Sequence, residues 1–414
     1  MERQRDRQST LVPSVSGSLP LSVWLQFGLD RCLENPPDIL KGGARFGLLM
    51  NQASVDGHLR YACDLLATAF PGQLQALFSP QHGLWGEEQA NMIESAHSRY
   101  EPLGLPVYSL YSETRRPTAE MLRGLDCLVV DLQDVGTRVY TFVWTVQQCL
   151  FACAEAGASV VILDRPNLLG GQIVEGPMLD PEFRSFVGGW PIPLRHGLTL
   201  GELALLMNHE QQIGAKVEVV RMDGWRREML WSTTSRPWIW PSPNMPRVET
   251  TLLYPGQVLL EGTNLSEGRG TTLPFEVAGA PFVNAHQLLD ELQRFDHPGL
   301  TLRPIRFVPT FDKWRGERCG GIALHVIDPQ AVRSVATTVS LLDAVRRLYP
   351  RDFAWLPPPY EYERDKPPID ILFGSPGLRQ RLADAQPLSP GEVGQLTAFD
   401  ETDWLRRTSS VRLY

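Results

Sequence analysis

The chain has 414 residues, of which 43% are hydrophobic and 21% charged, an ordinary globular composition with enough length for two domains. The formal net charge is −8 and no block of Lys or Arg occurs, so a nucleic-acid partner is not expected. No apolar run reaches the length of a membrane span, and the six cysteines are scattered in a way that predicts buried free thiols.

Residues 1–20 are expected to form a flexible N-terminal tail. The overlapping segment LPLSVWLQFGLD is short, is interrupted by Ser22 and Gln26, and lacks a small-residue cleavage site, so it predicts the first amphipathic helix better than a signal peptide. A cytoplasmic location is therefore expected.

Short apolar runs then alternate with helical patterns between residues 43 and 246. The predicted strands with their trailing loops are RFGLLMN, QALFSPQHG, LPVYSLY, CLVVDLQDVG, SVVILDRPN and VEVVRMDGW. Helices are predicted over residues 117–125, 141–156 and 199–212. The alternation predicts a Rossmann-like α/β domain over residues 21–280, with a mostly parallel sheet covered by helices on both faces. No GxGxxG follows the first strand, so a dinucleotide is not supported.

The pattern changes after about residue 280, where we expect a smaller α+β auxiliary domain over residues 281–414. HQLLDELQRF and VRSVATTVSLLDAVRRLY predict helices, whereas LTLRPIRFVPTF and CGGIALHVID predict strands. The segment WLPPPYEYERDKPPID is too rich in proline for regular structure, and we expect it to cross the surface near the cleft.

Polar side chains follow the predicted strands of the first domain. Since ligands of open α/β sheets bind outside the carboxyl ends of the strands, this recurrence predicts one cleft, although each residue alone could be a turn residue. The residues are Asn51, Gln81, His82, Asp131, Gln133, Asp134, Asp164, Arg165 and Asn167.

The stretch EGTNLSEGRGTTLPF, residues 261–275, has the character of a site loop. Its glycines permit tight turns, and Glu261, Asn264, Glu267 and Arg269 offer donors and acceptors to a polyhydroxylated or anionic ligand. The alternative is a surface loop that satisfies its own polar groups.

At these residues the chain resembles the NamZ-type exo-β-N-acetylmuramidases, which remove terminal N-acetylmuramic acid from peptidoglycan fragments. The similarity runs through nearly the whole chain and is carried by RFGLLMNQASVDG, ALFSPQHGLWGE, LPVYSLYSETRRPTAEML, DLQDVGTRVYTF, LDRPNLLGG, VEGPMLD, FVGGWPIPLRHGLTLGELA, PSPNMP, YPGQVLLEGTNLSEGRGTTLPFEVAGAP and PTFDKWRGERCGG. The resemblance implies a Rossmann-like domain joined to a smaller one, a cleft at their junction, and hydrolysis of a β-glycosidic bond without a cofactor. Its substrate would be a small amino sugar or muropeptide. No CxxC or HExxH arrangement in the sequence suggests a zinc site, so no metal is expected.

One departure from the family pattern concerns the catalytic residue. The family segment that matches SPQHG carries glutamate before the histidine, and that glutamate is the proposed catalytic residue, whereas this chain has Gln81, a neutral amide that cannot protonate a leaving oxygen. Three explanations are open.

The first explanation is that the catalytic acid has moved along the same loop to Glu87 or its neighbour Glu88, with Glu87 favoured. A second carboxylate would then come from Glu267, Glu261 or Asp134.

The second explanation is that the 2-acetamido group of the substrate acts as nucleophile and Gln81 holds that group. The third is that hydrolysis has been lost and the protein binds a muropeptide without cleaving it. A hydrolase of another acidic or N-acetylated sugar is a further alternative, and the oligomeric state is undetermined.

Several side chains are candidates for binding the sugar. The lactyl carboxylate of muramic acid suits an arginine fork, for which Arg138 and Arg269 are the preferred candidates. His82 could orient a carboxylate, donate to the leaving group or tie its loop to the backbone, and Asn244 between prolines would present a rigid amide. The remaining candidates, each of which could instead be structural, are Tyr140, Arg165, Arg195 and His196.

Overall fold

The computed structural model describes residues 25–89 and 92–414, so the predicted tail at residues 1–20 lies outside the described residues. Residues 19–24 of the segment predicted as the first helix lie outside the described residues, and within the described part α1 (Gly28–Glu34) begins at Gly28. The Asp30 carboxylate fixes this start by accepting a 2.8 Å hydrogen bond from the backbone N–H of Phe27.

Within the described residues, the first part of the molecule is built on a seven-stranded sheet in the order β3-β4-β2-β1-β5-β6-β9. The strands are β1 (Phe46–Met50), β2 (Leu74–Ser79), β3 (Ser98–Tyr100), β4 (Leu105–Ser109), β5 (Cys127–Asp131), β6 (Ser159–Leu163) and β9 (Lys216–Val220). β3 runs antiparallel to β4 and the other pairings are parallel, which confirms the predicted sheet and its six predicted strands. The chain reverses its direction of winding between β1 and β5, where ligands of such sheets bind.

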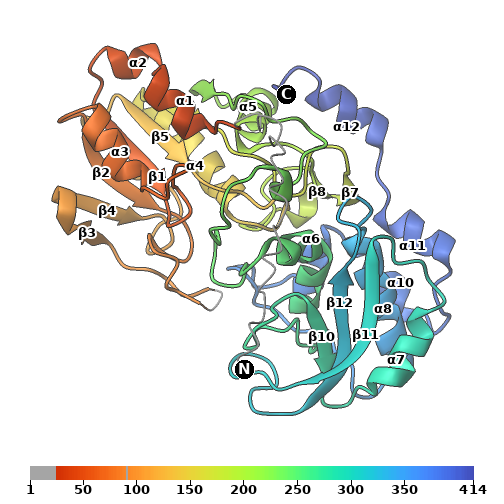
Figure 1. Ribbon diagram of the computed structural model, residues 1–414. Helices are drawn as coiled ribbons and strands as arrows, with labels where there is room; N and C mark the ends of the chain where they lie inside the picture. The colour runs from red at the N-terminus through yellow and green to blue at the C-terminus, as the bar shows by residue number, and fades with distance from the viewer. Residues whose placement is uncertain (1–24, 90–91) are drawn as a thin grey trace, which may run out of the picture.

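Helices cover both faces of this sheet (Figure 1). On one face, α1, α2 (Asp38–Lys41) and α3 (Ala62–Ala69) bury Cys32, Leu40 and Leu66 with Leu48 of β1. On the other, α4 (Phe142–Ala156) and α5 (Leu200–Glu210) pack in the cluster that contains Leu49. Adjacent residues of β1 thus enter opposite cores, as expected for a fully buried strand.

The helix predicted over residues 117–125 is wrong, because residues 119–124 form turns. A single i+4 hydrogen bond, from Leu122 N–H to the Thr118 carbonyl, gives way to i+3 bonds that end at Leu125. Gly124 then adopts φ +77°, which stops any continuation of a right-handed helix.

The second part contains a three-stranded antiparallel sheet in the order β10-β12-β11. Its strands are β10 (Val277–Ala280), β11 (Leu300–Phe307) and β12 (Cys319–Val326), and its helices include α6 (Val248–Gln257), α7 (Ala285–Leu292) and α8 (Ser334–Leu348). The predicted strands and helices after residue 280 are therefore confirmed. β10 joins this sheet although it precedes the predicted boundary at residue 280, which stays a prediction.

Short elements connect and complete these two parts. They are β7 (Glu175–Met178), β8 (Pro193–Arg195), α9 (Pro368–Phe373), α10 (Gly377–Ala383), α11 (Pro390–Thr397), α12 (Glu401–Thr408) and the 3₁₀ helices η1 (Glu101–Leu103), η2 (Pro181–Phe183), η3 (Trp231–Thr233) and η4 (Val258–Gly262). Across the described chain, no helix combines the length and apolar character needed to cross a membrane. All six cysteines are buried free thiols, as predicted.

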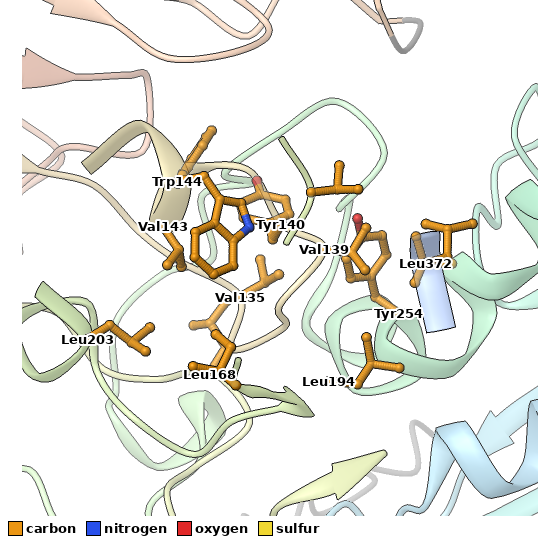
Figure 2. Packing of buried hydrophobic residues seen from close by; sticks show 14 of the residues in the cluster. Val135, Val139, Tyr140, Val143, Trp144, Leu168, Leu194, Leu203, Tyr254 and Leu372 are labelled. Carbon is orange, nitrogen blue, oxygen red and sulfur yellow. The ribbon is translucent and has the colours of Figure 1, made fainter. Parts of the chain in front are cut away.

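The two parts share one hydrophobic core. Figure 2 shows Trp144 of α4, Tyr254 of α6 and Leu372 of α9 in the same cluster of buried side chains. The end of the chain also returns to the first part, because the Tyr414 hydroxyl donates a 2.8 Å hydrogen bond to the buried Asp164 carboxylate. Figure 1 shows this return, with α11 and α12 leading back to the C-terminus near α5.

Candidate active site

A pocket lies where the loops after β2 and β5 meet the second part of the molecule. It is partly open to solvent. Both the first and the second part contribute to its walls. The lining residues are Gln81, His82, Val139, Tyr140, Thr141, Phe142, Val187, Ser242, Asn244, Met245, Tyr254, Glu261, Arg269, Phe275, Tyr360 and Glu361.

Glu361 is a carboxyl group of this pocket that was not a candidate from the sequence. Only 3% of the residue is exposed, and its Oε2 accepts a 3.0 Å hydrogen bond from the Tyr111 hydroxyl. Burial raises the pKa of Glu361 from its usual 4.5 to about 7, with a further rise from the charge of Glu261, while Tyr111, Arg115 and Gln81 act in the opposite direction. At neutral pH this group can both hold and release a proton.

A tight turn delivers Glu361 to the pocket. Tyr360 and Glu363 exchange two backbone hydrogen bonds of 2.9 Å, and between them Glu361 and Tyr362 have φ of +42° and +71°. Positive φ at both central residues is typical of a type I′ turn, which favours Asn and Gly rather than Glu and Tyr. The Arg115 guanidinium helps to hold this conformation, because it lies 4.5 Å over the Tyr362 ring and 4.2 Å over the Tyr111 ring.

Gln81 lies beside Glu361 and is held in place by a second contact. Its buried Oε1 accepts a 2.7 Å hydrogen bond from the Thr141 hydroxyl, which leaves the amide nitrogen as the group that can donate. The side-chain hydrogen bond from Gln81 lowers the pKa of Glu361, although burial outweighs it. Gln81 cannot act as an acid itself, but its amide contacts the carboxyl group of Glu361.

His82 ties the loop after β2 to the backbone. Its Nδ1 is 2.7 Å from the Glu88 carbonyl oxygen, which can only accept, so Nδ1 carries the proton. Removal from water lowers the pKa of His82 to about 4, and the nearby Arg269 charge acts in the same direction. The imidazole is therefore neutral at physiological pH. The backbone of His82 has a φ of +75°, which is unusual for a residue other than glycine and indicates a constrained loop.

A charged network includes two of the residues that line the pocket, Glu261 and Arg269. The Arg269 guanidinium is 2.7 Å from Glu261 and 3.2 Å from Glu267, and the latter is also 2.8 Å from the Lys313 ammonium. Burial acts against the charge of Arg269, but the carboxylates of Glu261 and Glu267 raise its pKa above the usual value. The Tyr360 hydroxyl donates a 2.6 Å hydrogen bond to Glu261, so the network reaches the turn that carries Glu361.

The predicted site loop at residues 261–275 contributes only some of its polar residues to the pocket. Glu261 and Arg269 line it, whereas Asn264 does not. Asn264 instead donates 2.7 Å to the Asp352 carbonyl and accepts 3.0 Å from the Ala354 N–H. Glu267 supports Arg269 without lining the pocket.

Glu87 and Glu88 lie outside the pocket lining. Glu87 is exposed, and its carboxylate accepts a 3.0 Å hydrogen bond from the backbone N–H of Trp85. Glu88 contributes its carbonyl to His82. The structure does not bring either carboxylate to the pocket that holds Gln81 and Glu361.

The remaining candidates of the strand loops are engaged elsewhere and do not form one cleft with Gln81. Asn51 donates 2.8 Å to the Pro241 carbonyl, and Arg165 forms a bidentate pair with Asp131 at 2.5 and 2.8 Å. Nε2 of the buried His196 is 3.5 Å from the Asp134 carboxylate, and Asp134 also accepts a hydrogen bond from the Gly136 N–H.

Arg138 and Arg195 are buried and bind backbone carbonyls. Arg138 donates to the carbonyls of Pro177, Ile192, Leu372 and Phe373, and burial lowers its pKa to about 9. Arg195 donates to the carbonyls of Leu169 and Val332. Neither arginine lines the pocket, whereas Tyr140, Asn244 and Arg269 do.

Fold and site together define a class of protein. Two buried carboxyl groups, Glu261 and Glu361, face one pocket next to the winding reversal of an α/β sheet, and such a pair is what a glycoside hydrolase needs. The chain belongs to the NamZ family: the family models described as exo-β-N-acetylmuramidase NamZ, N-terminal and C-terminal, match residues 46–249 and 252–414. The resemblance seen in the sequence is thereby confirmed.

Individual relatives agree with this family. The chain is 46% identical over 332 residues to the peptidoglycan β-N-acetylmuramidase NamZ of Bacillus subtilis (strain 168), covering 80% of each sequence. Crystal structures of two DUF1343 family proteins from Bacteroides fragilis NCTC 9343 are also similar. One has a TM-score of 0.83 at 33% identity, covering 95% of this chain and 99% of its own. The other has a TM-score of 0.72 at 28% identity, covering 94% of this chain and 99% of its own.

Proposed function

We propose that this protein is an exo-acting β-N-acetylmuramidase that releases terminal N-acetylmuramic acid from peptidoglycan fragments. The family supplies the activity, since the Bacillus subtilis relative is a peptidoglycan β-N-acetylmuramidase. The observation that carries the proposal to this chain is that Glu261 and Glu361 line the same pocket. Glycoside hydrolysis needs a proton donor and a second carboxyl group or a substitute for it, so Gln81 does not remove the required chemistry.

The pocket combines aromatic and charged walls. Buried Tyr254 and Phe275 line it, and the ion-paired Glu261 and Arg269 line the same space. Aromatic walls with a few placed polar groups are typical of small-molecule sites.

The roles of individual binding residues follow as proposals. Arg269 is the arginine of the pocket lining that could meet the lactyl carboxylate of muramic acid, although it also serves Glu261 and Glu267. Asn244, whose amide nitrogen is 3.0 Å from the Gln89 carbonyl, lines the pocket and could meet the acetamido group. A muropeptide as the natural substrate and a cytoplasmic location stay predictions.

The direct test is release of N-acetylmuramic acid from the MurNAc-GlcNAc disaccharide and from 4-nitrophenyl β-N-acetylmuramide. The matched controls are GlcNAc-MurNAc, which hides muramic acid behind another sugar, and 4-nitrophenyl β-N-acetylglucosaminide, which lacks the lactyl group. We expect cleavage of the first pair only. Saturable binding of the disaccharide without turnover would instead identify a muropeptide-binding protein, and cleavage of the glucosaminide at a similar rate would identify a broader hydrolase.

A further inference from the structure

We propose that Glu361 is the proton donor of this hydrolysis and that Gln81 and Tyr111 are positioning residues for it. The inference rests on the proposed function and names the group that supplies the proton. It is carried by the position of Glu361 in the pocket, by its neutral partners and by the turn that presents it.

The first step is a comparison of the two carboxyl groups that line the pocket. Glu261 forms an ion pair with the Arg269 guanidinium at 2.7 Å. Glu361 is buried against the Tyr111 hydroxyl and the Gln81 amide, which carry no charge. Two carboxyl groups in such different surroundings divide the work, so that Glu361 keeps a proton to donate and Glu261 supplies negative charge.

The second step is the backbone that carries Glu361. Left-handed conformations of non-glycine residues cost about 1–3 kcal/mol each and persist only where the surroundings impose them. Glu361 and its neighbour Tyr362 both adopt one. Tyr111 and Arg115 from the first part, together with Glu261 through Tyr360, fix this turn. These contacts hold the Glu361 carboxyl group in the pocket, where a proton donor is needed.

The third step is the path of the proton and the electrons. Glu361 gives its proton to the glycosidic oxygen while the bond from C1 of muramic acid to that oxygen breaks, and the bonding pair leaves with the oxygen. A water molecule then forms the new bond to C1 and loses a proton, which restores the acid form of Glu361. When Glu361 is a carboxylate, the Gln81 amide and the Tyr111 hydroxyl donate to it. Gln81 is oriented for this role because its oxygen is occupied by Thr141.

The test uses the full chain and two substrates with different leaving groups. Protonation matters for the sugar alcohol released from MurNAc-GlcNAc and much less for 4-nitrophenolate, which leaves without a proton. We expect Glu361→Gln to lose about 10²–10⁴-fold in kcat on the disaccharide, the usual contribution of general acid catalysis, and far less on the nitrophenyl glycoside. The pH limb of the native enzyme near 7 should disappear in this variant.

The matched control is Glu363→Gln, which makes the same change on the same turn, where the Glu363 carboxylate is 3.6 Å from the Lys366 ammonium. It should keep native kinetics on both substrates. Equal activity of Glu361→Gln and the native chain would overturn the inference, as would a selective loss in Glu87→Gln. If the native chain cleaves neither substrate while Gln81→Glu does, the proposed function itself fails, and that result is distinct from a wrong proton donor.

Discussion

The Tyr111 hydroxyl donates a 3.0 Å hydrogen bond to the Glu361 carboxylate, and 250 residues of chain separate the two partners. Tyr111 follows β4 of the first sheet, whereas Glu361 belongs to the proline-rich segment of the second part. The pocket is therefore complete only when both parts are folded against each other, and a hydrogen bond between the two parts lowers the pKa of its carboxyl group against the effect of burial.

This hydrogen bond predicts a shift in the pH profile of Tyr111→Phe. The hydroxyl stabilises the ionised form of Glu361, so its loss raises the pKa of Glu361 above about 7. The alkaline limb of kcat/KM should move up by about one pH unit, because a hydrogen bond to a charged group is worth about 1.5 kcal/mol or more. A profile measured on MurNAc-GlcNAc from pH 5 to 9 decides this, and an unchanged or lowered limb contradicts it.

Glu361→Gln should make the protein more stable at high pH. The pKa of Glu361 is raised on folding, so the native state binds more protons than the unfolded state between pH 4.5 and about 7. Stability is therefore lost as the pH rises through that window, and the full penalty applies above it. At about 1.4 kcal/mol per pKa unit, the variant gains at most about 3 kcal/mol over the native chain at pH 8. Urea unfolding should show no such gain at pH 4, nor for Glu363→Gln at either pH.

Gly270→Ala should destabilise the protein much more than Gly316→Ala. Both glycines have φ of +78°, so the conformational cost of a Cβ is the same. A Cβ at Gly270 would meet the Phe311 carbonyl oxygen at 2.5 Å, whereas no atom lies within 4 Å at Gly316. We expect a loss of about 1 kcal/mol for Gly316→Ala and about 3 kcal/mol for Gly270→Ala. Similar melting temperatures for the two variants would contradict the close approach of the Phe311 carbonyl oxygen to Gly270.

Arg138→Met tests whether Arg138 is structural or binds the substrate. Its guanidinium donates to four backbone carbonyls, two of them in α9, and the variant leaves these buried acceptors unpaired. We expect a loss of about 3 kcal/mol in unfolding free energy with KM little changed in the protein that remains folded. The control is Arg184→Met, whose exposed guanidinium lies over Trp190. A raised KM without a change in melting temperature would instead indicate that the Arg138 guanidinium binds the lactyl carboxylate of the substrate.

Much of the fold could be predicted because its signals are local. The six parallel strands are short apolar runs that end in polar residues, and four of them, β1, β2, β5 and β6, are largely buried in a sheet covered by helices. β3 was missed because three residues, SRY, carry no period. α6 was missed because Pro255 and Gly256 interrupt its helical pattern, yet Gly256 is required where a Cβ would meet the Ser334 carbonyl oxygen at 1.9 Å.

The site could be predicted only in part, because the sequence shows which polar residues follow strands and not which partners they meet. Gln81 lines the pocket as expected, whereas Asn51 and Arg165 are satisfied by other contacts. Glu361 had no periodic pattern around it, and the one available signal was an acidic and aromatic YEYE run inside a long proline-rich segment near the cleft. That segment was expected to cross the surface, but Tyr360 and Glu361 are buried.

The return of the chain to the first part has a consequence for synthesis of the protein. Asp164, at the end of β6, accepts hydrogen bonds from Thr199 and Gly201 and also from Tyr414, and Leu413 donates to Glu202 of α5. Ribosomes add these last partners long after β6 and α5 have emerged. The buried Asp164 carboxylate therefore gains its hydrogen bond from Tyr414 only after Tyr414 has been synthesised. The first part of the molecule reaches its final stability only at that point of translation.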